Sequence, residues 1–304
     1  MSYFDCVVIG AGVAGMTSAI YLKRYNLNVL LIEKGAPGGQ ITQTPNVENY
    51  PGYSSIDGAS LALNIFSQVS NLGVSYQYGD VIKIEDLGER KIVYTDNGNY
   101  ETRSIIIASG RKPKKLGLEK ENQLVGRGIS WCATCDGSFY KNQHVAVVGG
   151  GNSAIEEALF LSDICKRVDI LYRGENLRAD EVLQQKILKK NNVKIHYNTQ
   201  VEELIEEENK LVGIKISKEE NIEHLKIDGL FIYIGYEPDT SFLETLELKL
   251  DNQYIVVNQN METNITGIYA CGDVVKKELY QLTTAVGEAS LAAYQVKKFL
   301  EIVK

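Results

Sequence analysis

The sequence lacks the long apolar runs and basic segments that mark membrane, secreted and nucleic-acid-binding proteins. No apolar stretch in the 304 residues reaches the roughly 18 residues that a membrane-spanning helix needs. The N-terminal segment has no basic region of the kind that opens a secretory signal peptide. The formal net charge is -7, which disfavours a nucleic-acid backbone as a partner. We therefore expect a cytoplasmic protein that binds neither membrane nor nucleic acid.

Cysteine and histidine are scarce, and their spacing argues against two common uses. Of the five cysteines, Cys6, Cys165 and Cys271 are isolated. Such a set does not form the framework of a secreted disulfide-rich domain, and it fits a reducing compartment. The three histidines have no paired spacing and there is no second C-x-x-C, so the roughly four ligands of a zinc site are not in evidence. We expect no metal site.

The two remaining cysteines, Cys132 and Cys135, stand close together in the segment WCATCDG. Two cysteines at this spacing can close and reopen a disulfide ring, in which one thiol attacks a partner and the other resolves the mixed disulfide. The same spacing also occurs in half of a zinc site and in inert structural pairs. Asp136 could exchange a proton with a leaving thiolate, although it could equally cap a helix or turn.

The N-terminal part of the chain has the pattern strand, glycine turn, helix, strand and acid. An apolar run at residues 4–9 enters GAGVAG at 10–15, and a helical pattern continues to about residue 25. A second apolar run at 28–32 ends at Glu33. This order is typical of a dinucleotide-binding βαβ unit.

Each residue of that turn has a physical reason to be there. Gly10 permits the tight turn, Gly12 lets a pyrophosphate approach the backbone, and Gly15 lets the helix pack against the strand. The free N–H groups of the helix N-terminus favour phosphate oxygens. Glu33 is placed to accept hydrogen bonds from ribose hydroxyls, which suits an unphosphorylated adenosine such as that of FAD.

The same pattern returns after the cysteine pair. An apolar run at 145–148 enters GGGNSA at 149–154, a helix is predicted to about residue 162, and a strand is predicted at 168–171. With 304 residues in total, the repeat indicates two domains.

The second unit differs from the first at the position of the acid. Tyr172 stands there, followed by Arg173 and, further along, Arg178. Guanidinium groups bind phosphate oxygens through two parallel hydrogen bonds, so the second turn is predicted to prefer NADPH over NADH. The alternative interpretation is that both arginines lie on a solvated loop.

Other segments give weaker indications. Residues 35–52 are rich in glycine, proline, threonine and asparagine, and we predict no regular element there. They could wrap a cofactor or form an ordinary surface loop. Further helices are predicted over residues 58–72, 181–190 and 283–301. Strand-like runs between 193 and 233 are predicted to turn at Gly213 and around Asn221.

These motifs together resemble the low-molecular-weight, bacterial-type thioredoxin reductases. The resemblance spans essentially the whole chain and rests on GAGVAG at 10–15, GGQITQTPNVENYPG at 38–52, WCATCDG at 131–137, GGGNSAIEEA at 149–158 and ACGDV at 270–274. A dithiol just before the second glycine turn separates this family from glutathione-reductase-like enzymes, whose dithiol lies near the first.

The resemblance implies an α/β protein with two three-layer, Rossmann-like domains. A discontinuous FAD domain is expected at residues 1–113 and 246–304, with an inserted NADPH domain at 114–245 that carries the dithiol. The family is homodimeric, and its members pass electrons from NADPH through FAD and the dithiol to thioredoxin. By the same resemblance, Cys135 exchanges electrons with the flavin, Cys132 attacks thioredoxin, and Asp136 is the acid and base.

The resemblance also assigns cofactor-binding residues by position. For FAD these are Gly10, Gly12, Ala14, Gly15, Glu33, Lys34, Gly39, Gln40, Asn49, Val81, Gly110, Gly272, Asp273, Gln281 and Leu282. For NADPH they are Gly149, Gly151, Asn152, Ser153, Ala154, Tyr172, Arg173 and Arg178.

The chain departs from the family in two places. The family's usual His-Arg-Arg is Tyr172-Arg173-Gly174 here, and the usual Arg-Gln before the last helix is Tyr280-Gln281. Three alternatives therefore stay open: a ferredoxin-dependent flavin thioredoxin reductase, a reductase of another disulfide carrier, and a non-catalytic FAD-binding redox sensor. The sensor would not need the two cysteines and the aspartate together.

Overall fold

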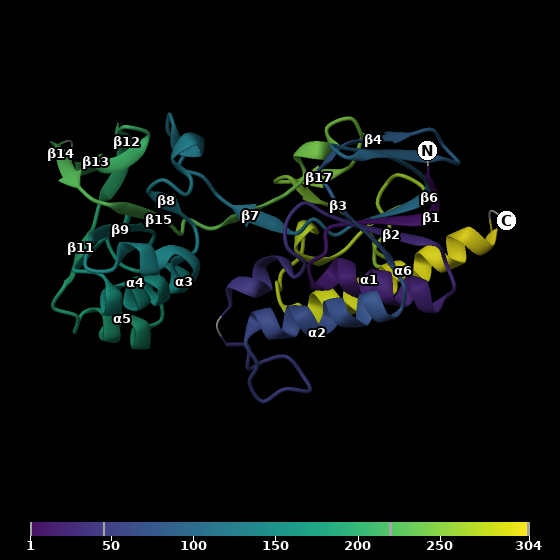
Figure 1. Ribbon diagram of the computed structural model, residues 1–304, viewed down its shortest axis with the longest axis horizontal. Helices are drawn as coiled ribbons and strands as arrows, with labels where there is room; N and C mark the ends of the chain where they lie inside the picture. The colour runs from purple at the N-terminus through teal and green to yellow at the C-terminus, as the bar shows by residue number, and fades with distance from the viewer. Residues whose placement is uncertain (1, 45, 219–220, 303–304) are drawn as a thin grey trace. The chain divides into compact units, whose positions relative to one another are not determined.

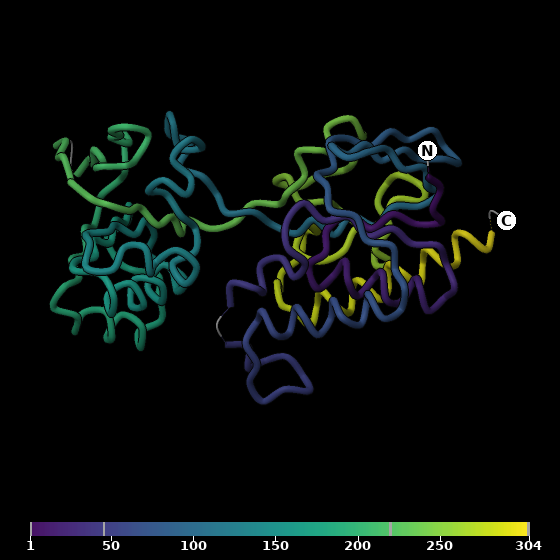
Figure 2. Tube along the Cα trace, in the orientation of Figure 1, coloured from purple at the N-terminus to yellow at the C-terminus, as the bar shows by residue number. Residues whose placement is uncertain are grey.

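The computed structural model of the protein describes residues 2–44, 46–218 and 221–302. Figure 1 shows its helices and strands and Figure 2 the path of the chain. The chain divides into two compact units, of which the first holds the residues up to Lys112 and from Glu237 onward, and the second holds Pro113–Tyr236. Two short paired strands, β7 (Arg111–Pro113) and β16 (Tyr236–Pro238), lie where the chain passes between the units.

The return to the first unit comes earlier than the expected residue 246. Asp239 forms an ion pair with Lys34 in the first unit, and Leu243 is buried in that unit's core. These contacts assign the segment after Glu237 to the first unit.

The first unit is built on a sheet with the strand order β3-β2-β1-β6-β5-β4, and β19 also pairs with β6. Strands β3, β2, β1, β6 and β19 run parallel, while β4 and β5 join as an antiparallel meander. Helices α1, α2 and α6 lie together along this sheet (Figure 1). The strands are β1 (Ser2–Ile9), β2 (Val29–Glu33), β3 (Ser75–Tyr78), β4 (Val81–Asp86), β5 (Lys91–Thr95), β6 (Gly98–Ile107), β17 (Leu250–Asp251), β18 (Tyr254–Ile255) and β19 (Ile268–Ala270), and the helices are α1 (Val13–Arg24), α2 (Gly58–Asn71) and α6 (Leu282–Ile302).

The sheet of the first unit is buried on both faces. Cys6 and Val8 of β1 pack into a cluster with α1 and α6, whereas Val7 and Ile9 pack into a second cluster with β4, β5 and the segment around Val274. Strands covered on both sides need apolar residues at every position, which explains the continuous apolar runs in β1 and β2.

The second unit has a parallel sheet with the order β11-β10-β9-β15-β8. Helices α3, α4 and α5 cover one face and an antiparallel sheet, β12-β13-β14, covers the other, so the unit has three layers (Figure 1). The elements are β8 (Ile129–Ser130), α3 (Ala133–Asp136), β9 (His144–Val148), α4 (Asn152–Ile164), β10 (Arg167–Leu171), α5 (Glu181–Ile187), β11 (Val193–His196), β12 (Thr199–Glu207), β13 (Lys210–Lys218), β14 (Asn221–Lys226) and β15 (Gly229–Ile232).

Two local predictions were wrong. Gly213 lies inside β13, and the preceding turn falls at Glu208 and Asn209, which both adopt positive φ. The segment predicted to be irregular contains a 3-10 helix at Gly39–Gln43, because Gly38 and Gly39 reach positive φ and let the chain turn. The turn expected around Asn221 lies partly outside the described residues.

Within the described ranges, no helix is both long enough and apolar enough to cross a membrane.

Candidate active site

The first glycine turn joins β1 to α1 and has room for a ligand. A Cβ on Gly15 would lie 1.7 Å from the carbonyl oxygen of Gly10, so close packing of helix on turn requires glycine there. A Cβ on Gly12 would meet nothing within 4 Å. Gly12 is also the N-cap of α1 and offers no side chain to its free N–H groups. Open space at an uncapped helix start is what a pyrophosphate requires.

The acid of the first unit faces this turn. Glu33 accepts a hydrogen bond from the Ala11 N–H at 2.6 Å and another from the Gly35 N–H at 2.8 Å. The space beside it is lined by Gly10, Val81 and Lys34. With Glu33 itself, this places four predicted FAD residues around one pocket at the end of β2. Lys34 itself is paired with Asp239 at 2.5 Å.

Two further pairs of predicted FAD residues meet across long stretches of sequence. The Asn49 amide donates to Gln281 Oε1 at 3.1 Å. Gly272, with φ of 76°, lies against Ala14, because a Cβ on Gly272 would be 2.7 Å from the Ala14 side chain. Leu282 starts α6 and packs against the cluster under the Gly39–Gln43 helix.

Asp273 lies at an ionic site that sequence reasoning missed. The Arg111 guanidinium donates to Asp273 at 2.7 Å, and the Arg111 carbonyl accepts from the Gln40 amide at 2.9 Å. The ring of Tyr280, the residue that departs from the family, lies 4.3 Å from the Arg111 guanidinium. Gly110, with φ of 67°, forms the turn before this arginine. A guanidinium on an aromatic face is a favourable cation–π arrangement.

The second glycine turn repeats the geometry of the first, with Ala154 in place of Gly15. Gly151 is the N-cap of α4, offers no side chain to it, and has open space where a Cβ would stand. Gly149 needs glycine, because a Cβ would lie 2.3 Å from the Tyr233 carbonyl oxygen. Ala154, at the position of Gly15, is buried. The second turn therefore also fits a pyrophosphate.

The family departure at Gly174 has a local cause. A Cβ on Gly174 would lie 2.8 Å from the Tyr172 ring, and a Cβ on Gly150 would lie 2.5 Å from the same ring. The ring thus fills the space between two glycines. A side chain at Gly174 can be accommodated only if Tyr172 moves.

One of the two predicted phosphate-binding arginines, Arg178, lies beside this turn. The backbone N–H of Arg178 donates to the Gly150 carbonyl at 2.7 Å. The Asn152 side chain exchanges two hydrogen bonds with Asp180, at 2.8 and 2.9 Å, and so ties the next loop to the start of α4. Arg173 and Ser153 are exposed.

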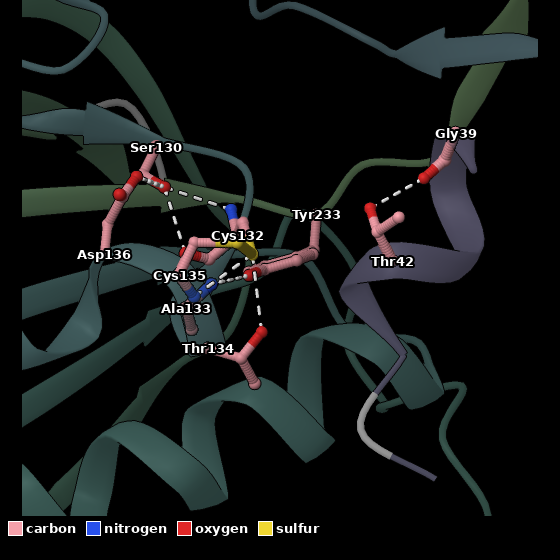
Figure 3. Close-up of a disulfide and its surroundings, with 9 residues drawn as sticks. All are labelled: Gly39, Thr42, Ser130, Cys132, Ala133, Thr134, Cys135, Asp136 and Tyr233. Atoms are coloured by element: carbon pink, nitrogen blue, oxygen red, sulfur yellow. Dashed lines mark hydrogen bonds between the residues drawn. A yellow bond between two sulfur atoms is a disulfide. The ribbon is translucent and has the colours of Figure 1, made fainter. Parts of the chain in front are cut away.

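The cysteine pair forms a disulfide at the start of α3 (Figure 3). The two Cα atoms are 5.3 Å apart, and Cys132 is the N-cap of the helix. The Cys135 N–H donates to Cys132 Sγ at 3.2 Å. Among the described residues, no group of histidine, cysteine and carboxylate side chains could hold a metal ion. The disulfide fits the redox interpretation of the pair.

Asp136 is tied to the disulfide turn by the hydroxyl of Ser130, a residue that no sequence pattern singled out. The buried Ser130 hydroxyl accepts the Cys132 N–H at 3.0 Å and donates to Asp136 Oδ2 at 2.7 Å. The Asp136 side chain does not cap the short helix that follows it, and one of its oxygens is held by the same hydroxyl that accepts the Cys132 N–H.

A second hydroxyl reaches the turn from Tyr233, just past β15, and accepts the Ala133 N–H at 2.7 Å (Figure 3). Tyr233 was missed as well. Strand alternation could have indicated its direction, because Phe231 two residues earlier faces the same helix layer.

The isolated cysteines are unsuited to thiol chemistry. Burial raises the pKa of the Cys6 and Cys271 thiols to about 12 and that of Cys165 to about 11. The thiolate is the reactive form, so these cysteines are structural and the bonded pair carries the exchange chemistry.

Comparisons with known proteins agree with this geometry. Residues 4–289 match the family described as pyridine nucleotide-disulphide oxidoreductase. The chain is 42% identical over 303 residues to a thioredoxin reductase of Listeria monocytogenes serovar 1/2a, a span that covers 99% of this chain and 95% of the relative.

Solved structures give the same result. The thioredoxin reductase of Lactococcus lactis superposes with a TM-score of 0.89 at 39% identity, covering 98% of this chain and 99% of that one. A ferredoxin-flavin thioredoxin reductase of Clostridium acetobutylicum superposes with a TM-score of 0.57 at 29% identity, covering 99% of each chain. The chain therefore belongs to the pyridine nucleotide-disulphide oxidoreductases and, within them, to the thioredoxin reductases.

Proposed function

We propose that the protein is an FAD-dependent NADPH:thioredoxin-disulfide oxidoreductase. The observation that carries the proposal is the Cys132–Cys135 disulfide, held with Asp136 at the start of α3. The pair lies in the same unit as the glycine turn and arginines that suit NADPH. The family membership supports the same activity.

We assign the cofactors to the two glycine turns. FAD would bind the first unit, with its pyrophosphate at Gly12 and its ribose at Glu33, and with Asn49, Asp273 and Gln281 available to its polar parts. NADPH would bind the second unit at Gly151, with its 2′-phosphate at Arg173 and Arg178. When bound, the two cofactors supply hydride transfer between nicotinamide and flavin, which the protein side chains cannot supply.

The protein's own residues perform the disulfide exchange. Once the Cys132–Cys135 disulfide has taken up two electrons, the Cys132 thiolate attacks one sulfur of the thioredoxin disulfide and the other sulfur leaves as a thiolate. Cys135 then attacks Cys132, which releases reduced thioredoxin and restores the disulfide. Asp136, with one oxygen fixed by Ser130, would deliver a proton to the leaving thiolate.

Three further features belong to the same proposal. Thioredoxin is the expected disulfide partner, a second copy of the chain is the expected partner in a homodimer, and the cytoplasm is the expected location. The buried thiols of Cys6, Cys165 and Cys271 support a reducing compartment. Light scattering of the purified protein tests the dimer directly.

Turnover assays test the activity. NADPH oxidation is followed with oxidised thioredoxin for the wild type, Cys132→Ser and Cys135→Ser. We expect turnover for the wild type and none for either variant, with flavin retained in all three. A Cys135→Ser variant that still reduces thioredoxin would contradict the mechanism. Turnover with reduced ferredoxin but not with NADPH would support the ferredoxin-dependent alternative instead.

A further inference from the structure

Tyr233 contacts both functional turns of the second unit. Its hydroxyl accepts the Ala133 N–H of the disulfide turn at 2.7 Å. Its backbone N–H donates to the Val148 carbonyl at 2.8 Å. Its own carbonyl oxygen lies so close to Gly149 that a Cβ there would be 2.3 Å from it. One residue therefore joins the start of the dithiol helix to the glycine turn.

The hydrogen bond to Ala133 has no ready substitute. Ala133 is fully buried, so water has poor access to its N–H if the hydroxyl is removed. A buried donor without an acceptor is costly. The Cys132 N–H next to it is held in the same way by Ser130. Two side-chain hydroxyls thus hold the two successive N–H groups that begin the turn, and Ser130 lies on β8, the strand paired with β15.

A half-buried carboxyl group, that of Glu157, is the charged neighbour that most affects Tyr233. Glu157 of α4 lies close enough to Tyr233 to affect its pKa, and among the described residues the buried Glu157 Oε2 has no hydrogen-bond partner of its own. Because the hydroxyl accepts from Ala133, its proton is free to point toward Glu157. Burial, and to a smaller extent Glu157, raises the pKa of Tyr233, so the hydroxyl keeps this proton.

We propose that Tyr233 is a positioning residue for the dithiol, which holds the Ala133 N–H so that Cys132 and Cys135 stay at bonding distance, and that Glu157 fixes the direction of its hydroxyl. The inference rests on the proposed exchange role of the cysteine pair. When the disulfide opens, a held turn keeps Cys135 ready to resolve the mixed disulfide, whereas a released turn lets the two sulfurs separate.

The first test measures the dithiol without thioredoxin or NADPH. The flavin-loaded wild type, Tyr233→Phe and the matched control Tyr197→Phe are equilibrated with dithiothreitol buffers, and free thiols are counted by alkylation and mass. Tyr197 packs on the same core and follows β11, at the opposite edge of the sheet. For Tyr233→Phe we expect about a tenfold shift toward the dithiol, equal to about 30 mV. The same dithiol–disulfide equilibrium in all three proteins would overturn the proposal.

The second test separates positioning from binding. With thioredoxin as substrate, Tyr233→Phe should lower kcat about tenfold and leave KM within about twofold, because Tyr233 serves the reacting sulfurs and not the partner's surface. A higher KM with unchanged kcat would overturn the positioning role. An unreactive wild type whose dithiol equilibrium still shifts in Tyr233→Phe would refute the proposed function and leave this inference intact.

Glu157→Gln tests separately whether Glu157 fixes the direction of the Tyr233 hydroxyl. It should shift the dithiol equilibrium in the same direction by about threefold, and it should add nothing in the Tyr233→Phe background. An additive double variant, or no shift from Glu157→Gln alone, would remove Glu157 from the proposal.

Discussion

The two units of the protein use one local plan for two different ligands. Both have a buried strand, a glycine turn, a helix with an uncapped start and a second parallel strand. They differ where the second strand ends, because the first unit has Glu33 and the second has Tyr172 followed by arginines. In the proposed assignment, the glycines allow a dinucleotide to bind and the residues after the second strand select which one.

The two turns should differ strongly in how much an exchange of their third small residue destabilises the protein. Gly15→Ala should abolish FAD retention and lower the free energy of unfolding by more than about 3 kcal/mol, because the new Cβ would lie 1.7 Å from the Gly10 carbonyl oxygen. Ala154→Gly in the second turn should cost only about 1 kcal/mol. Flavin content and urea denaturation measure both. A stable, yellow Gly15→Ala protein would show that α1 can move away from its turn.

The units also bury charge differently. In the second unit Asp169 is fully buried and is bound by Arg167 at 2.8 Å, by His196 at 2.6 Å and by His144. Asp169→Asn should lower the free energy of unfolding by about 3 kcal/mol, because these partners lose their carboxylate. In the first unit the buried Lys91 has a partly exposed partner, Asp86, at 3.3 Å.

The Asp169 contribution should depend on pH with a definite sign. Hydrogen bonds from His196 and Arg167 outweigh burial and lower the pKa of Asp169 well below its usual range. The stabilisation is therefore complete above the unfolded-state pKa of about 3.9 and is lost as the pH falls below it. Urea denaturation of the wild type and Asp169→Asn as a function of pH measures this. A difference that stays constant down to about pH 3 would contradict the assignment.

Substitutions in the two units should affect different coenzymes. Arg173→Ala and Arg178→Ala should each raise KM for NADPH about tenfold, the effect of losing about 1.4 kcal/mol of binding, with little change for NADH. Glu33→Gln should leave both KM values unchanged and weaken retention of FAD. Steady-state kinetics and flavin content give the comparison. Equal effects on the KM values for NADPH and NADH would mean that these arginines do not bind the 2′-phosphate.

The smallest effect is expected at the family departure. Gly174→Arg alone should not tighten NADPH, because its Cβ would lie 2.8 Å from the Tyr172 ring. The double variant Tyr172→His with Gly174→Arg should tighten NADPH by up to about fivefold, the value of an exposed charge pair. Binding of 2′,5′-ADP measured by calorimetry compares the variants. Tightening by Gly174→Arg alone would mean that the ring moves freely.

The fold was largely predictable because its signals are local. Helix α1, predicted to about residue 25, ends at Arg24, and α6, predicted over 283–301, spans Leu282–Ile302. Continuous apolar runs predicted the parallel strands, since buried strands need apolar residues on both faces. The return of the chain at Glu237 was not predictable, because the ion pair of Asp239 joins residues 205 positions apart.

In the site, too, the residues of a local motif were predictable and a residue held by a long-range contact was not. Cys132, Cys135 and Asp136 form one compact motif and could be found by their spacing. For Tyr233, strand alternation could indicate only the face of the sheet, and not the Ala133 N–H, 100 positions away, that its hydroxyl meets.

Anaerobic titration of the flavin-loaded protein with NADPH, and separately with NADH, tests most directly the claim that the two turns serve two different dinucleotides. We predict that NADPH bleaches the flavin absorbance at about one to two equivalents, that NADH is much less effective, and that oxidised thioredoxin restores the colour. A flavin that neither nucleotide bleaches, although dithionite does, would contradict the account and would make another protein the electron donor.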